Sequence, residues 1–289
     1  MHIILNNRFE PGIRLSYSQT EIVSNPRQIR HPTAREALTL LNIKDKLEIV
    51  SLADVPAATG LGSSGSFTVG LLNALYAHQR MLRTPEEVAE TACDIAMNRL
   101  KEPSGKQDEY TASMGGIRSY EIDRKGRVTS KEIAISENTL AELEYGIMMF
   151  YTGITRSAGD ILGKQQAKVS KGDGDAVDKM HRIKEIGRES KRALERSDLR
   201  RFGELLHEHW MVKRGVTNNM TTHSVDAWYA TARKNGALGG KLVGAGGGGF
   251  LMLFCLEGRE KVRAALSRRG LTEMRFRFDF EGSKVIHNI

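Results

Sequence analysis

The sequence is poor in cysteine and has no long apolar run, and each absence excludes a class of protein. Only Cys93 and Cys255 occur in 289 residues, each inside an apolar stretch. This excludes a disulfide framework and favours a reducing compartment. No apolar run approaches the roughly 18 residues that a membrane span needs. The apolar part of the amino terminus, residues 1–5, is too short for a signal peptide. We therefore expect a cytoplasmic protein with no membrane partner.

Acidic residues are fewer than basic ones, with 35 Asp and Glu against 43 Lys and Arg, a formal net charge of +8. Much of the basic excess lies in residues 164–214, where Lys and Arg alternate with Glu and Asp. Charged residues of both signs at helical spacing are typical of a helix face exposed to solvent. The basic residues are not interspersed with aromatic residues, and no recognised nucleic-acid-binding motif occurs. We therefore expect no nucleic-acid partner; the alternative, a basic nucleic-acid surface, predicts an affinity that falls steeply with salt.

The order of the expected elements indicates an α+β protein with two lobes. Up to residue 152 the expected strands are 3–8, 13–17, 47–51 and 145–152, with a hairpin of strands 117–122 and 128–135 turned at 123–126. The expected helices are 32–41, one through 67–76, and one that a capping box at Thr84 and Glu87 opens and that ends at about residue 100. Four helices follow, and then strands return around a further helix. This order is not regular βαβ alternation, so we predict domains at residues 1–152 and 153–289. The expected elements after residue 152 are helices 157–169, 176–196, 198–213 and 222–235, strands 240–243 and 250–255, helix 260–268 and strand 273–280.

A glycine-rich stretch from Pro56 to Ser66 precedes an apolar segment with helical spacing. Glycines allow a ligand close to the backbone, and the helix beginning near Ser64 adds its positive dipole end. A phosphate group is the expected ligand. The spacing of Gly60, Gly62 and Gly65 also fits the dinucleotide-binding motif, but the required acidic residue after a second strand is missing. From this stretch alone, a glycine turn without a ligand remains an open alternative.

Two further stretches carry unusual residues. In the segment from Glu102 to Tyr110, an acid in a loop beside Lys106 could take a proton from a substrate hydroxyl, although alone the segment reads as a charged turn. The segment from Gly236 to Phe250 contains four consecutive glycines between two apolar strands. Each glycine costs backbone entropy on ordering, so close approach to a ligand or to another loop explains the run better than a permissive turn.

Together these stretches resemble the GHMP kinase superfamily. The P-x3-G-L-G-S-S loop lies at Pro56–Ser64, and the late glycine loop lies at Lys241–Gly249. The chain is most similar to the branch that acts on D-glycero-D-manno-heptose 7-phosphate, and the similarity extends over nearly all of it. The segments that carry this closer similarity are Ile13–Tyr17, Thr20–Ile22, His31, Arg35–Leu38, Gly105–Asp108, Tyr151–Arg156 and Gly236–Leu242.

The resemblance implies a ribosomal-protein-S5-like amino-terminal lobe, a ferredoxin-like carboxy-terminal lobe, and phosphoryl transfer from ATP, with Mg²⁺, to a sugar-phosphate hydroxyl. The implied product from heptose 7-phosphate is the 1,7-bisphosphate. Asp108 matches the catalytic aspartate, and the Ser64 hydroxyl would join the Mg²⁺ ligands. The implied ATP-binding residues are Pro56, Gly60, Leu61, Gly62, Ser63 and Ser64. The candidates for substrate binding are Lys106, Arg156 and Lys213, chosen on charge, with Gly246 and Gly247 of the late loop.

The sequence departs from the family pattern at two places. From the resemblance we expect the first family motif, a glycine turn, before the strand at Ile3, within about forty further residues that the given sequence does not include. Ala96 occupies the position, seven before Pro103, where relatives place a metal-binding glutamate. Two alternatives therefore stay open: a fucose- or galactose-type sugar kinase, and a nucleotide-binding remnant without activity. A homodimer is compatible with either. His207 and His209 point in different directions on their helix, so we expect no shared metal there.

Overall fold

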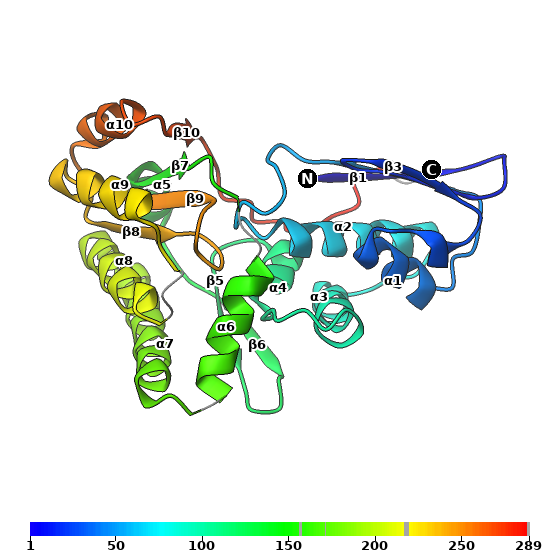
Figure 1. Cartoon of the computed structure of the whole chain (residues 1–289), viewed down its shortest axis with the longest axis horizontal. Helices are drawn as coiled ribbons and strands as arrows, with labels where there is room; N and C mark the ends of the chain where they lie inside the picture. The colour runs from blue at the N-terminus through cyan, green and yellow to red at the C-terminus, as the bar shows by residue number, and fades with distance from the viewer. Residues whose placement is uncertain (156–157, 171, 217–219, 288–289) are drawn as a thin grey trace. The chain divides into compact units, whose positions relative to one another are not determined.

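The computed structural model describes the chain except residues 156–157, 171, 217–219 and 288–289 (Figure 1). The backbone divides into two compact units. Unit 1 comprises Met1–Ala57, Gly62–Gly116 and Asp279–Ile289, and unit 2 comprises Ala58–Leu61 and Ile117–Phe278. Each unit combines helices with a sheet, which confirms the predicted α+β class. The chain passes from unit 1 into the main part of unit 2 at Ile117, whereas the predicted domain boundary lies at residue 152.

The sheet of unit 1 has four strands in the order β1-β4-β2-β3. Strand β4 pairs antiparallel with β1 and parallel with β2, and β2 forms a hairpin with β3. Strand β3 was not among the predicted elements, because a four-residue stretch containing a buried glutamate, Glu21, gives little periodic signal. The bounds are β1 His2–Asn7, β2 Ile13–Ser16, β3 Thr20–Val23 and β4 Leu47–Leu52.

The helices of unit 1 bury their apolar residues against this sheet. Leu71, Leu72 and Leu75 of α2 are fully buried and share one core with Ile13 and Ile49. The predicted capping box is present before α3, where the side chain of Thr84 accepts from the amide of Glu87. The bounds are η1 Pro26–Gln28, α1 Pro32–Leu40, α2 Ser63–His78, α3 Pro85–Cys93, the π-helical turn η2 Asp94–Arg99 and α4 Gln107–Met114.

The main sheet of unit 2 is antiparallel, in the order β10-β7-β9-β8. A separate hairpin, β5 with β6, confirms the predicted turn, in which the Gly126 amide donates to the Asp123 carbonyl. The last strand was predicted too long: β10 covers only Thr272–Met274, and the chain then leaves the sheet. The other bounds are β5 Arg118–Ile122, β6 Val128–Glu132, β7 Ile147–Tyr151, β8 Gly239–Leu242 and β9 Phe250–Phe254.

The largest apolar cluster of unit 2 contains Trp210, Phe150 and Leu253, and residues of its sheet and of three of its helices contribute to it. Helix α5 was not predicted, and its last residue, Gly146, lies against the ring of Phe254, where a Cβ atom would be only 2.5 Å away. Among the described residues, no helix is both long and apolar enough to cross a bilayer. The bounds are α5 Glu137–Gly146, α6 Ala158–Ser170, α7 Gly174–Glu195, α8 Leu199–Arg214, α9 His223–Lys234 and α10 Arg259–Ser267.

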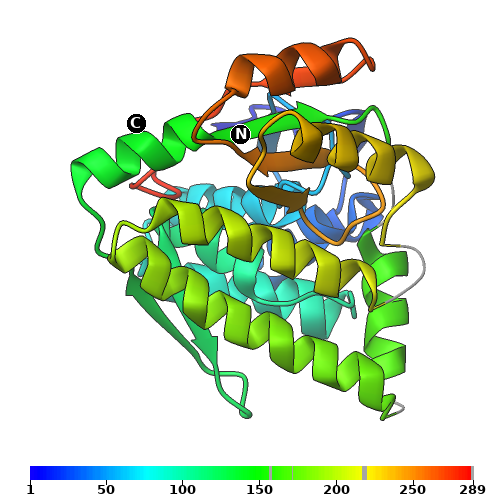
Figure 2. The same ribbon diagram turned by 90° about the vertical axis from the view of Figure 1, so that its left-hand side faces the viewer.

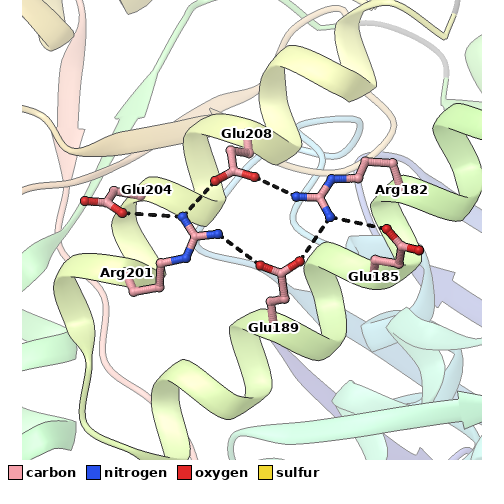
Figure 3. A network of polar contacts seen from close by, with 6 residues as sticks. All are labelled: Arg182, Glu185, Glu189, Arg201, Glu204 and Glu208. Atoms are coloured by element: carbon pink, nitrogen blue, oxygen red, sulfur yellow. Dashed lines mark hydrogen bonds and ion pairs between the residues drawn. The ribbon is translucent and has the colours of Figure 1, made fainter.

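Helices α7 and α8 lie side by side (Figure 2) and are linked by a network of ion pairs (Figure 3). Arg182 donates to Glu189 at 3.0 Å and to Glu208 at 2.8 Å. Arg201 donates to the same two carboxylates at 3.0 and 2.8 Å. The network also includes Glu185 and Glu204. Arg182 and Arg201, two of the arginines of this basic segment, therefore have acidic partners on the neighbouring helix.

We expect Arg201→Gln to destabilise unit 2 only slightly, because the side chain is 38% exposed and solvent screens such pairs. The melting temperature at low ionic strength should fall by no more than a few degrees, and the difference from the wild type should shrink in 1 M NaCl (roughly 3 Å screening length). Thermal unfolding at both salt concentrations checks this. A large loss that salt does not change would contradict it.

Candidate functional site

The first turn of α2 in unit 1 lies against the first turn of α4. Gly62 is the N-cap of α2, with φ +66°, and its position carries no side-chain cap. A Cβ atom on Gly62 would lie 3.3 Å from Cγ of Asp108, and one on Gly65 would lie 3.1 Å from Cβ of Asp108 and from the amide nitrogen of Glu109. The structure therefore brings the predicted phosphate-binding turn, Gly62–Ser64, together with the predicted catalytic Asp108. Ser64 and Asp108 are both exposed, as ligand-binding side chains must be.

The predicted loop around Asp108 is in fact the start of a helix. Asp108 is the second residue of α4, where the helix dipole favours a negative charge. Lys106 precedes the helix and donates to both carboxylate oxygens of Glu90 on α3, at 2.8 and 2.7 Å. Tyr110 donates to the same carboxylate. The charge of Lys106 is thus held by Glu90 inside unit 1.

Glu109 is a functional candidate that the sequence reasoning missed. Its side chain is buried, at 5% exposure, and its Oε2 atom has no hydrogen-bond partner. Burial raises the pKa of Glu109 to about 7, and the neighbouring carboxylates of Asp108 and Glu102 add to the rise. No pattern in the sequence distinguishes this buried acid from the exposed acids around it. It lies next to the predicted catalytic residue and accepts a proton more readily than an ordinary glutamate does.

We expect the stability of the protein to fall between pH 4.5 and pH 7 because of Glu109. In this window the folded chain holds a proton that the unfolded chain, with an ordinary glutamate pKa near 4.5, releases. The contribution of this proton to the free energy of unfolding is fully present below pH 4.5 and is lost as the pH rises through about 7. The pKa difference corresponds to at most about 3 kcal/mol. Urea denaturation of the wild type and Glu109→Gln at pH 5 and pH 8 checks this: the variant should gain stability relative to the wild type at pH 8. An equal difference at both pH values would contradict it.

In unit 2, the residues that precede Gly62 are in backbone contact with the late glycine loop. A Cβ atom on Gly60 would lie 2.5 Å from the carbonyl oxygen of Val243, and one on Gly244 would lie 2.7 Å from Cα of Gly60. The backbone approach is closer at Gly249, which has φ +87°: a Cβ atom added there would lie 2.0 Å from the carbonyl oxygen of Thr59. Of the two explanations for the glycine run, close approach to another loop is therefore confirmed by the geometry.

The remaining predicted substrate residues lie on or beside the late loop. The Gly247 amide donates to the carbonyl of Met220 at 3.0 Å, and a Cβ on Gly246 would lie 3.0 Å from the same oxygen. Lys213, in the last turn of α8, donates to the carbonyl of Gly244 at 2.7 Å. Arg156 lies outside the described residues. Pro56 belongs to unit 1 and is exposed, and Leu61 belongs to unit 2 and is partly buried.

The described residues around Ala96 supply few ligands for a metal ion. Ala96 is buried in η2 and offers no carboxylate. The nearby Asp94 already accepts from Asn98 at 2.8 Å and from Arg99 at 3.1 Å. Across the part of the chain that the structure describes, no group of three or more His, Cys, Asp or Glu side chains could hold a metal. Mg²⁺ commonly takes one or two protein ligands with phosphate oxygens and water, so the exposed Ser64 hydroxyl fits a metal that a nucleotide brings with it.

Family models match both halves of the chain. The model "GHMP kinases N terminal domain" matches residues 32–116, and "GHMP kinases C terminal" matches residues 190–271, together more than half of the chain. The first of these segments contains α2, α3 and α4, and the second contains α8, α9, β8, β9 and α10. Both glycine loops and Asp108 therefore lie within, or directly at, the matched segments.

Proteins with similar sequences are also named as small-molecule kinases. A D-glycero-alpha-D-manno-heptose 7-phosphate kinase of Campylobacter jejuni is 32% identical over 202 residues, which are 70% of this chain and 59% of that protein. The chain thus matches less than two thirds of this relative's length. A mevalonate kinase of Methanothermobacter thermautotrophicus is 26% identical, with 92% of this chain and 86% of that protein covered.

Solved structures share the fold. The structure of a D-glycero-D-manno-heptose 1-phosphate kinase from Bacteroides thetaiotaomicron matches with a TM-score of 0.76 at 22% identity, over 97% of this chain and 84% of that one. Galactokinase of Lactococcus lactis, solved with galactose, matches with a TM-score of 0.74 at 15% identity, over 98% of this chain and 86% of that one. The two matched models and the shared two-domain α+β fold lead to one conclusion: the chain belongs to the GHMP kinase family.

Proposed function

We propose that the protein transfers the γ-phosphoryl group of ATP to a hydroxyl of a sugar phosphate, with D-glycero-D-manno-heptose 7-phosphate as substrate and the 1,7-bisphosphate as product. The observation that supports this most is the contact between the first turns of α2 and α4. It sets an exposed carboxylate, Asp108, beside a helix N-terminus that has no side-chain cap. A helix N-terminus attracts phosphate, and a carboxylate beside it is placed to act on a hydroxyl that attacks that phosphate.

In the proposed reaction, Asp108 orients the substrate hydroxyl and accepts its proton while the oxygen forms a bond to the γ-phosphorus. The bond from that phosphorus to the β,γ-bridging oxygen breaks, and ADP leaves. The amides of Gly62, Ser63 and Ser64 bind the nucleotide phosphates. Pro56, Gly60 and Leu61 complete the proposed nucleotide-binding stretch. Mg²⁺, held by Ser64 and the nucleotide itself, would neutralise phosphate charge.

The heptose phosphate is proposed because of the relative from Campylobacter jejuni, which is named for that substrate. A fucose-type kinase is the second candidate, because an L-fucokinase/L-fucose-1-P guanylyltransferase of Bacteroides fragilis is 24% identical over 229 residues. We further propose a cytoplasmic protein that acts on small molecules, with domains at residues 1–152 and 153–289. Lys213, Gly246 and Gly247 are proposed to contact the substrate, and so are Lys106 and Arg156.

The test is an assay with ATP and Mg²⁺ over heptose 7-phosphate, unphosphorylated heptose, fucose and galactose, followed by product analysis. We expect turnover of the heptose phosphate to exceed that of each free sugar. Turnover of fucose or galactose alone would replace the heptose proposal with the second candidate. Tight ATP binding without transfer to any sugar would identify a nucleotide-binding remnant instead.

A further inference from the structure

Helices α9 and α10 of unit 2 lie side by side (Figure 1 and Figure 2), and their carboxy-terminal ends flank an open cavity. The two helices share one apolar core, to which α9 contributes Tyr229 and Ala232 and α10 contributes Val262 and Leu266. The cavity has a volume of about 410 Å³. The residues that line it are Thr231, Lys234, Asn235, Ala265, Arg268 and Arg269, so three of the six are cations and none is an acid.

The three cations of this cavity have no acidic partner. On the same helix, Arg263 is paired with Glu273, so α10 has a carboxylate within reach of its earlier turn. In the part of the chain that the structure describes, by contrast, no ion pair involves Lys234, Arg268 or Arg269. All three side chains are exposed. The protein itself therefore supplies no anion for this group of charges.

The helix ends do not account for all of this charge. A helix carboxy terminus attracts cations, but the last turns of both helices are closed by backbone hydrogen bonds. The Ala237 amide donates to the Ala232 carbonyl of α9 at 3.1 Å, and the Gly270 amide donates to the Ser267 carbonyl of α10 at 2.9 Å. Each helix end carries about half a negative charge. Three cations therefore leave an excess of about two positive charges at the cavity.

The cavity lies at the opposite end of α9 from the late glycine loop. The helix begins at His223, close to Met220, whose carbonyl accepts from the Gly247 amide of that loop at 3.0 Å. Twelve helical residues then lead to the cavity, a length of about 18 Å. The cavity is thus separate from the glycine loop that we associate with the substrate.

The lining of the cavity suits a small anion better than an apolar ligand. Ala265 is the one apolar residue among those that line it. The neutral polar side chains already donate within α9: the Thr231 hydroxyl to the Ala227 carbonyl at 2.7 Å, and the Asn235 amide to the Thr231 carbonyl at 2.8 Å. Recognition therefore falls to the guanidinium groups, which bind phosphate oxygens bidentately, and to the lysine. The volume is at the lower end of the range for small-molecule sites.

We propose that Lys234, Arg268 and Arg269 form an anion site that takes the diphosphate group of a small molecule. Two linked phosphates allow the cations of both helix ends to contact one ligand. The group is shared by inorganic pyrophosphate and nucleoside diphosphates, and the experiment distinguishes these two sources. The inference goes beyond the proposed phosphoryl transfer and does not depend on it.

Calorimetric titrations on the full chain test the site without turnover. Inorganic pyrophosphate and ADP are titrated separately, at low ionic strength and without Mg²⁺, with a non-hydrolysable ATP analogue present to occupy the proposed nucleotide site. We expect Arg268→Gln with Arg269→Gln to weaken pyrophosphate binding about 10-fold, and Lys234→Gln about 3-fold, as for charge pairs that solvent reaches. The matched control, Arg124→Gln with Lys125→Gln, removes two charges from the exposed turn between β5 and β6 and should leave the affinity unchanged.

Circular dichroism and thermal unfolding show that each variant is folded before its titration is interpreted. Arginine-dependent binding of ADP as well as pyrophosphate supports the site with a nucleoside diphosphate as a source, and binding of pyrophosphate alone supports it for the free anion. The site is overturned if pyrophosphate does not bind, if the folded Arg268 and Arg269 double variant binds it as the wild type does, or if the control loses as much affinity. Arginine-dependent binding by a protein that transfers no phosphoryl group would refute only the proposed reaction.

Discussion

Asp108→Asn should lower kcat about 10³-fold while leaving the affinity for ATP nearly unchanged, because general-base contributions are typically 10²- to 10⁴-fold. The amide keeps the size of the side chain at the start of α4, so the packing of Gly62 and Gly65 against residue 108 is retained. What is lost is the group that orients the hydroxyl and accepts its proton. Steady-state kinetics with heptose 7-phosphate, together with titration of ATP, separates the two effects.

The matched control for Asp108→Asn is Glu86→Gln. Glu86 is an exposed acid in the first turn of α3, also in unit 1, and we place it in no binding or catalytic role. Its conversion to an amide should leave kcat and KM unchanged. If Asp108→Asn keeps more than about a tenth of the wild-type kcat, residue 108 is not the general base, since that loss is below the usual range.

Gly249→Ala should destabilise unit 2 strongly and abolish nucleotide binding. The new methyl group would lie 2.0 Å from the Thr59 carbonyl oxygen, and the backbone at φ +87° is one that side chains disfavour. Backbone must therefore move in both loops, and Thr59 is fully buried, so it has little room to move. We expect a loss of about 3 kcal/mol, from steric strain together with the backbone conformation. Chemical denaturation measures the loss, and titration with ATP measures the binding.

Gly126→Ala separates the contact from the backbone strain. Gly126 has a similar φ of +78°, but a Cβ atom there would meet nothing within 4 Å. This variant should lose only about 1 kcal/mol, the cost of the backbone conformation alone, and should bind ATP normally. If both variants lose the same stability, the contact between residues 59 and 249 contributes nothing to it.

Much of the fold could be predicted from periodicity and capping. The capping box at Thr84 and the hairpin turn at Asp123 were both predicted and are both present. Local signals fail where an element depends on its neighbours. Helix α5 was missed because the helix ends directly at a strand, at Gly146, and β10 was predicted too long because apolar residues continue beyond Met274.

The candidate site could be predicted only in part, for a physical reason. Glycine loops and an acid with the family's spacing are visible in the sequence, so Asp108 and the α2 turn could be identified. Burial and long-range contacts are not visible, so the buried Glu109 could not be identified. Lys106 was chosen on charge, and its partner Glu90, sixteen residues earlier, is recognised only in the structure.

The most direct test of the proposed reaction is phosphorus NMR of the wild-type protein with ATP, Mg²⁺ and D-glycero-D-manno-heptose 7-phosphate. As ATP is converted to ADP, we expect a second sugar phosphate signal beside the original one, in equal amount to the ADP formed. The proposed reaction is contradicted if ATP persists unchanged, or if ATP is hydrolysed to inorganic phosphate while the heptose 7-phosphate signal stays alone.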